Sequence, residues 1–108
     1  MIKQTEAQFQ KAIIDLAHYT GWVCAHFRGV RVQRKSGSVY YQTPVAADGA
    51  GYPDLVFVRE RVVYAEIKVG YNKPSPEQTM WLELLAKAGQ EVYVWTPKEW
   101  DEIKDVLQ

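Results

Sequence analysis

The sequence predicts an α/β fold, a central mixed β-sheet flanked by helices, with its elements in the order α-β-β-β-β-α-β-α. The strongest strand signals are residues 55–58 and 62–69, and the three residues between them suit a hairpin turn. Three segments begin with capping patterns and continue with apolar residues at helical spacing. A strand predicted at residues 91–95 follows a predicted helix, which indicates a parallel crossover and therefore a mixed sheet.

The first predicted helix begins at a capping box. Thr5 is the N-cap, and Gln8 reaches back from the third helical position. Gly21 offers the left-handed stop at the C-terminal end. The apolar positions between them recur at helical spacing: Phe9, Ala12, Ile13, Leu16 and Ala17.

The middle of the chain predicts strands and loops. Residues 22–28 are short, aromatic and β-branched, which favours a strand. Residues 29–38 are expected to form a basic loop or a loosely ordered hairpin arm, and residues 39–45 a strand that extends to Pro44. The small residues at 46–51 form a connection flexible enough to approach a ligand closely.

Two further helices carry the same start signals. Ser75 and Gln78 form the capping box of the second helix, which Gly89 ends. Thr96 caps the third helix. Apolar stripes follow in both: Trp81, Leu84, Leu85 and Ala88 in the second helix, and Trp100, Ile103 and Leu107 in the third.

Composition predicts a single globular domain over residues 1–108, because 47% of the residues are apolar and 24% are charged. Thirteen Lys and Arg balance thirteen Asp and Glu, so net charge indicates no particular partner. Cys24 is the only cysteine, which excludes an intramolecular disulfide or a multi-cysteine metal site and favours a reducing compartment. No apolar run approaches the roughly 18 residues of a membrane span. The N-terminus carries no signal-peptide core, so we expect a cytoplasmic protein with no membrane partner.

Charge is unevenly distributed along the chain. Residues 16–47 contain no acidic residue but several cations, followed by aromatic residues, a pattern that suits an arm lying over a polyanion. A solvated surface loop is the alternative. The candidate DNA contacts are four residues of this stretch and one lysine ahead of the second helix: Arg28, Arg31, Arg34, Lys35 and Lys73.

Two acidic residues occupy positions that favour other residue types. Asp54 stands at the start of a predicted strand, and Glu66 lies in the middle of the segment best suited to burial. Glu66 and Lys68 share one face of their strand because side chains alternate. The predicted hairpin brings Asp54 and Glu66 onto neighbouring strands, so two carboxylates and an ammonium should meet at one edge of the sheet.

This juxtaposition points to a metal-assisted reaction. Converging carboxylates repel each other unless a cation lies between them, and oxygen ligands favour Mg²⁺ or Mn²⁺. Lys68 is placed to orient or polarise a water beside the metal, which suits phosphodiester hydrolysis. The alternative is an exposed pair of Glu66 and Lys68 on an edge strand. His18 and His26 are not needed by this chemistry.

Three motifs follow one another along the chain: Gly51-Tyr52-Pro53-Asp54-Leu55, Glu66-Ile67-Lys68 and Ser75-Pro76-Glu77-Gln78. In this order and spacing they resemble the PD-(D/E)xK nuclease superfamily and, within it, the virus-type replication-repair (VRR-NUC) group. The resemblance extends from Thr5-Glu6 to Val92-Tyr93-Val94-Trp95. It implies a restriction-endonuclease-like core, and the length suits the stand-alone form found in phages and bacteria.

The resemblance also implies roles for individual residues. Lys68 would be the catalytic lysine, acting with Asp54 and Glu66, while Gln10 and Gln78 match family glutamines near the site. The implied metal ligands are the side chains of Glu6, Asp54 and Glu66 and the backbone carbonyl of Ile67. The cofactor would be Mg²⁺ or Mn²⁺, with no small-molecule cofactor.

The expected function is a metal-dependent DNA endonuclease, a homodimeric resolvase of four-way (Holliday) junctions or other branched DNA. Alternatives are a flap- or end-directed nuclease, a restriction-type enzyme, a non-catalytic DNA-binding module on the same fold, or a structural domain with an incidental ion pair. Two observations favour a dimer: a junction has approximate two-fold symmetry, and a chain this small carries many large aromatics. Those that could face outward are Tyr40, Tyr41, Trp81 and Trp100.

Overall fold

The structure, a computed structural model, describes residues 4–27, 30–42 and 45–108. Two of the sequence predictions fall outside these ranges, the candidate DNA contact Arg28 and the strand end at Pro44. The side chains of residues 30, 31, 41 and 42 also lie outside the description, so that of Arg31 is not placed.

A four-stranded mixed sheet forms the centre of the molecule. Its strand order is β1 (Val23–His26), β4 (Leu55–Val58), β5 (Val62–Ile67) and β6 (Glu91–Trp95). β1 and β4 pair antiparallel, as do β4 and β5, whereas β5 and β6 pair parallel. The predicted α/β class, the antiparallel hairpin and the parallel crossover are therefore confirmed.

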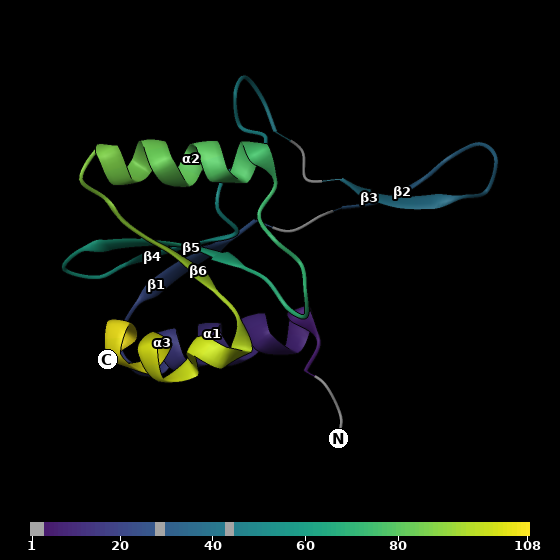
Figure 1. Ribbon diagram of the computed structural model, residues 1–108. Helices are drawn as coiled ribbons and strands as arrows, with labels where there is room; N and C mark the ends of the chain where they lie inside the picture. The colour runs from purple at the N-terminus through teal and green to yellow at the C-terminus, as the bar shows by residue number, and fades with distance from the viewer. Residues whose placement is uncertain (1–3, 28–29, 43–44) are drawn as a thin grey trace.

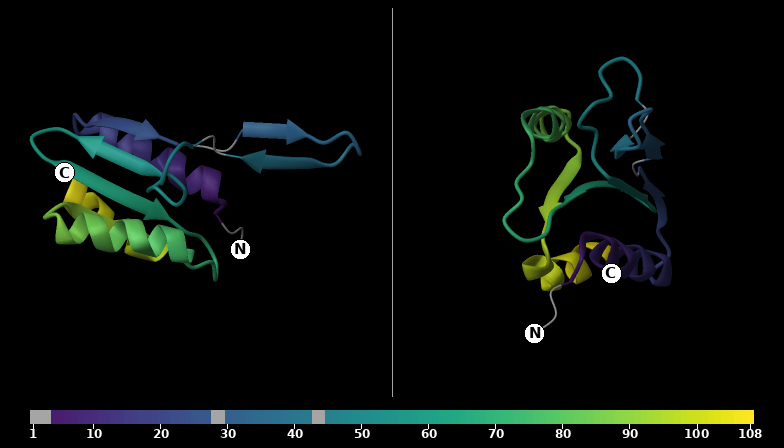
Figure 2. Two further views of the ribbon diagram at one scale, coloured as in Figure 1. Left: turned by 90° about the horizontal axis from the view of Figure 1, so that it is seen from above. Right: turned by 90° about the vertical axis from the view of Figure 1, so that its right-hand side faces the viewer.

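Helices cover both faces of this sheet (Figures 1 and 2). α1 (Glu6–Tyr19) and α3 (Trp100–Leu107), which follows the short 3₁₀ helix η1 (Pro97–Glu99), lie together on one face. α2 (Pro76–Lys87) lies alone on the other. No helix within the described residues is long and apolar enough to cross a membrane.

The helix starts agree with the sequence. Thr5 and Ser75 each accept a hydrogen bond from the backbone N–H three residues on, and a glutamine completes both capping boxes. Thr96 forms a third box that starts η1 rather than α3 itself. Gly21 and Gly89 adopt φ of +89° and +86° just beyond the ends of α1 and α2, in the left-handed region expected of a glycine stop.

The core lies between the sheet and the pair α1 and α3. Its helical residues come from α1 and α3, while α2, which is described in full, contributes no fully buried residue. The core residues are Phe9, Ile13, Ala17, Trp22, Leu55, Phe57, Val63, Ala65, Ile67, Trp95, Ile103 and Leu107. Because strand side chains alternate, Asp54 and Glu66 lie on the opposite face, beneath α2. The cavity described below opens on this face, next to Asp54.

The predicted order of elements along the chain needs one correction, because five strands rather than four precede α2. Residues 30–42 form a hairpin of β2 (Val30–Gln33) and β3 (Val39–Gln42), a two-stranded sheet separate from the central one. This hairpin projects away from the body of the molecule (Figure 1). Residues 30–33 alternate valine with polar residues, a strand pattern that the basic charge of the segment obscured. Gly37 closes the turn at φ +92°.

Candidate active site

The β4–β5 register brings Asp54 and Glu66 together. Leu55 pairs with Ala65, so Asp54 and Glu66 stand one position further along at the same end of the two strands. The backbone N–H of Asp54 donates to Glu66 Oε1 at 3.3 Å, and the N–H of Ile67 donates to Asp54 Oδ2 at 3.4 Å. The predicted juxtaposition of the two carboxylates is therefore confirmed.

Glu66 is enclosed by polar partners. Its side chain is 1% exposed, and Lys68 Nζ lies 3.4 Å from its Oε2. The side-chain Nε2 of Gln78 donates to the same oxygen at 2.6 Å. β5 lies between β4 and β6 in the sheet, so an exposed Glu66–Lys68 pair on an edge strand is excluded.

The protonation of Glu66 reflects this setting. Burial raises the pKa of the Glu66 carboxyl well above its usual range, and the neighbouring Asp54 carboxylate raises it further. The ammonium of Lys68 lowers the pKa but does not reverse the shift. The ionised pair is thus unfavourable in the protein alone, and a cation between the two carboxylates would relieve it.

Gln78 reaches Glu66 because a loop fixes the start of α2. Gly51, at φ +84°, packs so closely that a Cβ there would stand 2.6 Å from the backbone carbon of Glu77 and 2.7 Å from the N of Gln78. Trp81 Nε1 donates to the backbone oxygens of Asp48 and Ala50 at 3.0 and 3.1 Å. Residues 46–51 thus approach α2 closely at Gly51, while the close approach to a ligand expected of this segment stays a prediction.

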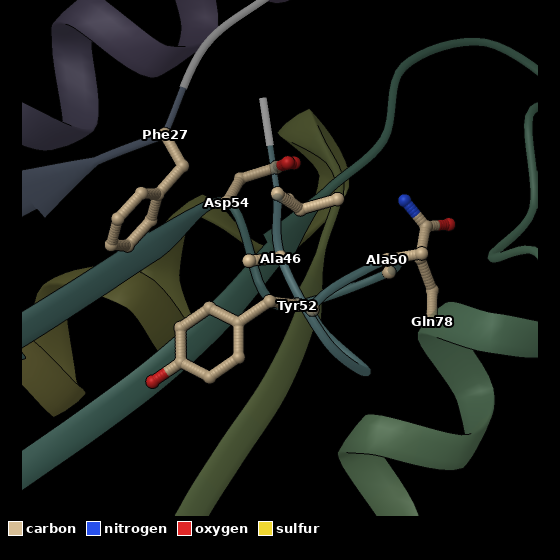
Figure 3. A pocket seen from close by; sticks show the side chains of 9 residues that line it. Phe27, Ala46, Ala50, Tyr52, Asp54 and Gln78 are labelled. Carbon is tan, nitrogen blue, oxygen red and sulfur yellow. The ribbon is translucent and has the colours of Figure 1, made fainter. Parts of the chain in front are cut away.

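A cavity of about 600 Å³ opens beside the carboxylates. The rings of Phe27 and Tyr52 lie on one side of it, the amide of Gln78 lies opposite them, and the carboxylate of Asp54 lies between (Figure 3). Sequence reasoning did not single out Phe27 or Tyr52 as site residues. The one available signal was the position of Tyr52, two residues before Asp54 in the motif.

The other residues implied by the family resemblance lie elsewhere or remain unassigned. Glu6 is the first residue of α1 and is exposed. No three His, Cys, Asp or Glu side chains gather into a metal-binding group within the described ranges, so Glu6 does not join the carboxylate pair there. Gln10 lines a different hollow, with Ile14 and His26. The metal roles of Glu6 and of the Ile67 carbonyl stay predictions.

The candidate DNA contacts occupy two places. Arg34 and Lys35 are exposed on the β2–β3 hairpin, where the Arg34 guanidinium lies 4.1 Å from the centre of the Tyr40 ring. Arg31 belongs to β2 by its backbone. Lys73 is exposed in the connection between β5 and α2. Arg34, Lys35 and Lys73, whose side chains the structure describes, are not among the residues that line the cavity.

No protein-family model, curated protein or solved structure matches the chain. Two carboxylates from adjacent strands, one of them buried and difficult to ionise, suit a hard divalent cation by their oxygen donors. The adjacent ammonium and amide add a positive charge and a hydrogen-bond donor. Such a set can hold a cation and attract an anionic substrate.

Proposed function

We propose that the protein is a divalent-metal-dependent nuclease that hydrolyses phosphodiester bonds in DNA. The observation that carries the proposal is the pairing of Asp54 with the buried Glu66, next to Lys68. A buried carboxylate beside a second carboxylate costs stability unless its charge is compensated, and Lys68 supplies only one positive charge. Mg²⁺ or Mn²⁺ bound by Asp54 and Glu66 would supply the remaining compensation.

Each side chain has a distinct task in this proposal. Asp54 and Glu66 would hold the cation, which when bound stabilises the negative charge that develops on the phosphate. Lys68 directs its ammonium at the same site, where it attracts the phosphate and orients the attacking water. Gln78 restrains the Glu66 carboxylate through the 2.6 Å hydrogen bond, so the ligand is preorganised.

The substrate proposed is branched DNA, with a homodimer as the working unit. Resolving a four-way junction needs paired cuts in two strands, and a two-fold dimer presents two equivalent sites. The projecting β2–β3 hairpin, with Arg34 and Lys35, supports contact with a phosphate backbone outside the cavity. The alternatives are a flap-directed nuclease and a non-catalytic DNA-binding module. Cleavage assays distinguish both from an endonuclease that acts on branched DNA.

The first experiment measures cleavage of labelled duplex, flap and four-way-junction DNA with Mg²⁺, with Mn²⁺ and with EDTA. Wild type should cut in either metal and not in EDTA. Asp54→Asn and Glu66→Gln keep the side-chain shape but remove a charge, so each should lower the rate at least a hundredfold. Their DNA affinity in EDTA should be kept or improved, because carboxylate–phosphate repulsion is reduced.

Glu83→Gln is the matched control, since it makes the same chemical change at an exposed position on α2. It should cleave at the wild-type rate. Near-wild-type cutting by Asp54→Asn or Glu66→Gln would contradict the proposal. Tight DNA binding without cleavage of any substrate would favour the binding module.

The dimer is tested separately. Light scattering at micromolar concentration should give a mass near twice 12.4 kDa. Mixing wild type with Asp54→Asn should produce heterodimers that nick a junction without making the paired cut. A strictly monomeric protein that makes paired cuts would refute this part of the proposal.

A further inference from the structure

The cavity beside Asp54 has an aromatic wall that the proposed metal chemistry does not use. Phe27 and Tyr52 meet edge to face with ring centres 5.7 Å apart, and Tyr52 meets Trp81 in the same way at 5.1 Å. Tyr64 supports Tyr52 from the sheet at 6.2 Å. The rings thus form one braced cluster from β1 to α2, with Tyr52 at its centre.

Phe27 is the exposed member of this wall. Its side chain is 46% exposed although it follows β1 directly, and its backbone N–H donates to the carbonyl oxygen of Asp54 at 2.9 Å. Phe27 therefore lines the cavity with a partly exposed ring, and its backbone is hydrogen-bonded to that of Asp54, a candidate metal ligand. An aromatic ring left open in a concave site is suited to cover the face of another flat group.

The rest of the lining restricts what that flat group can be. Ala46 and Ala50 provide small, apolar walls, and Asp54 is the only charged residue among the described residues that line the cavity. Without a bound cation, the Asp54 carboxylate repels an anion from the cavity, whereas a neutral ring carries no charge to be repelled. The volume of about 600 Å³ exceeds what one planar ring requires, so its attached sugar can enter as well.

We propose that this cavity binds the base of an unpaired nucleotide next to the phosphate that is cut. The inference rests on the proposed nuclease function, because it takes the substrate strand to lie across Asp54. In a nucleic-acid strand each phosphate is followed by a sugar and a base, so a strand held at Asp54 carries a neighbouring base to Phe27. A base inside a duplex has no free face, and the cavity therefore selects unpaired or extruded nucleotides.

Two oligonucleotides test this without any cleavage. The ¹⁵N-labelled full chain is titrated in EDTA with pentathymidylate and with an oligomer of equal length made of abasic nucleotides. Both carry the same phosphates, but only the first has bases. Pentathymidylate should shift the amide signals of Phe27, Ala50 and Tyr52 and bind about tenfold more tightly, within the range attributed to stacking on aromatic side chains.

Variants locate the effect. Phe27→Ala should lower the affinity for pentathymidylate about tenfold and leave the abasic oligomer unaffected. Ala50→Trp fills the cavity but keeps the aromatic wall. It should also lower the affinity for pentathymidylate and leave that for the abasic oligomer unaffected. Tyr71→Ala is the control, because Tyr71 is 99% exposed and does not line the cavity. The spectra of the free variants report whether each one is folded.

The outcomes separate this inference from the proposed function. Equal binding of both oligomers, or no shift at the cavity amides at millimolar pentathymidylate, overturns the base site. If the base site is overturned in this way but wild type cuts DNA in Mg²⁺, the proposed nuclease function stands without the base site. Base-dependent shifts at these amides in a protein that cuts no DNA would support the base site and overturn the nuclease.

Discussion

The side-chain amide of Gln78 joins α2 to the buried carboxylate of Glu66. Its Nε2 donates to Glu66 Oε2 at 2.6 Å, while its Oε1 accepts a hydrogen bond from the backbone N–H of Ser75 at 2.8 Å. One side chain therefore completes the cap of the helix and restrains the candidate metal ligand. Because an amide has separate donor and acceptor ends, substitution can remove the two functions separately.

The first prediction concerns this dual role. Gln78→Glu keeps the acceptor for the Ser75 N–H but replaces the donor to Glu66 with another carboxylate. We expect cleavage to fall at least tenfold, and unfolding in EDTA to occur at lower urea concentration at pH 8 than for wild type, because three carboxylates then converge. Gln78→Ala loses both hydrogen bonds and should lower the free energy of unfolding by about 1–2 kcal/mol. Wild-type cleavage by Gln78→Glu would show that the amide does not position Glu66.

The second prediction concerns pH. The pKa of Glu66 is raised in the folded protein, so the folded state retains a proton that the unfolded chain releases above about pH 4.5. The free energy of unfolding of the metal-free protein should therefore fall as pH rises from that value through the folded pKa. Glu66→Gln should lack this decline. Urea unfolding in EDTA between about pH 5 and 8 measures the difference, and parallel curves would contradict it.

Glu60 has the opposite effect on the pH dependence of stability, because its pKa is lowered and not raised in the folded protein. Hydrogen bonding to Arg59 lowers the pKa of Glu60 to about 2. Its contribution to stability is present above its unfolded pKa and is lost as pH falls toward 2. The two effects thus occupy different pH ranges, and the decline above pH 4.5 is attributable to Glu66.

The third prediction separates metal binding from turnover. Lys68→Ala should lower the cleavage rate at least a hundredfold, the scale expected when a group that acts on the reacting water or phosphate is removed. It should still bind Mn²⁺ in calorimetry, because the carboxylates remain. Lys87→Ala, at the exposed end of α2, is the control. Loss of Mn²⁺ binding in a folded Lys68→Ala protein would reassign Lys68 to a structural role.

The fourth prediction concerns the β2–β3 hairpin. Replacing Arg31, Arg34 and Lys35 with alanine should weaken binding to duplex, flap and junction DNA by similar factors. The slope of log affinity against log salt should become shallower by about 0.9 for each DNA phosphate that the hairpin no longer neutralises. Lys11→Ala on α1, where Lys11 pairs with Asp15, is the control. An unchanged slope would make the hairpin an ordinary solvated surface.

The fifth prediction concerns the single thiol. Burial raises the pKa of Cys24 from 9.0 to about 11, so the folded protein at pH 8 holds about a hundredfold less thiolate than the unfolded chain. Alkylation by iodoacetamide at pH 8 should slow by about this factor on folding. Mass spectrometry with and without urea measures both rates. Equal rates would show that Cys24 is open to solvent.

Local sequence alone determined much of the fold. The capping boxes at Thr5 and Ser75 act within four residues, so nothing distant was needed to place the starts of α1 and α2. The three residues between β4 and β5 set a register in which Asp54 must face Glu66. Short-range hydrogen bonding and the two-residue repeat of strands therefore predicted the carboxylate pair and Lys68 beside it.

Only the tertiary structure decided the surroundings of that pair. The hydrogen bond from Gln78 to Glu66, the braced rings from Phe27 to Trp81 and the cavity between them join residues on separate elements. The tertiary structure also places the β2–β3 hairpin outside the central sheet, and within the described residues Glu6 does not join the carboxylate pair. Such an arrangement depends on how α2 and its loop pack on the sheet. That packing is set by many weak, long-range interactions, which no local pattern encodes.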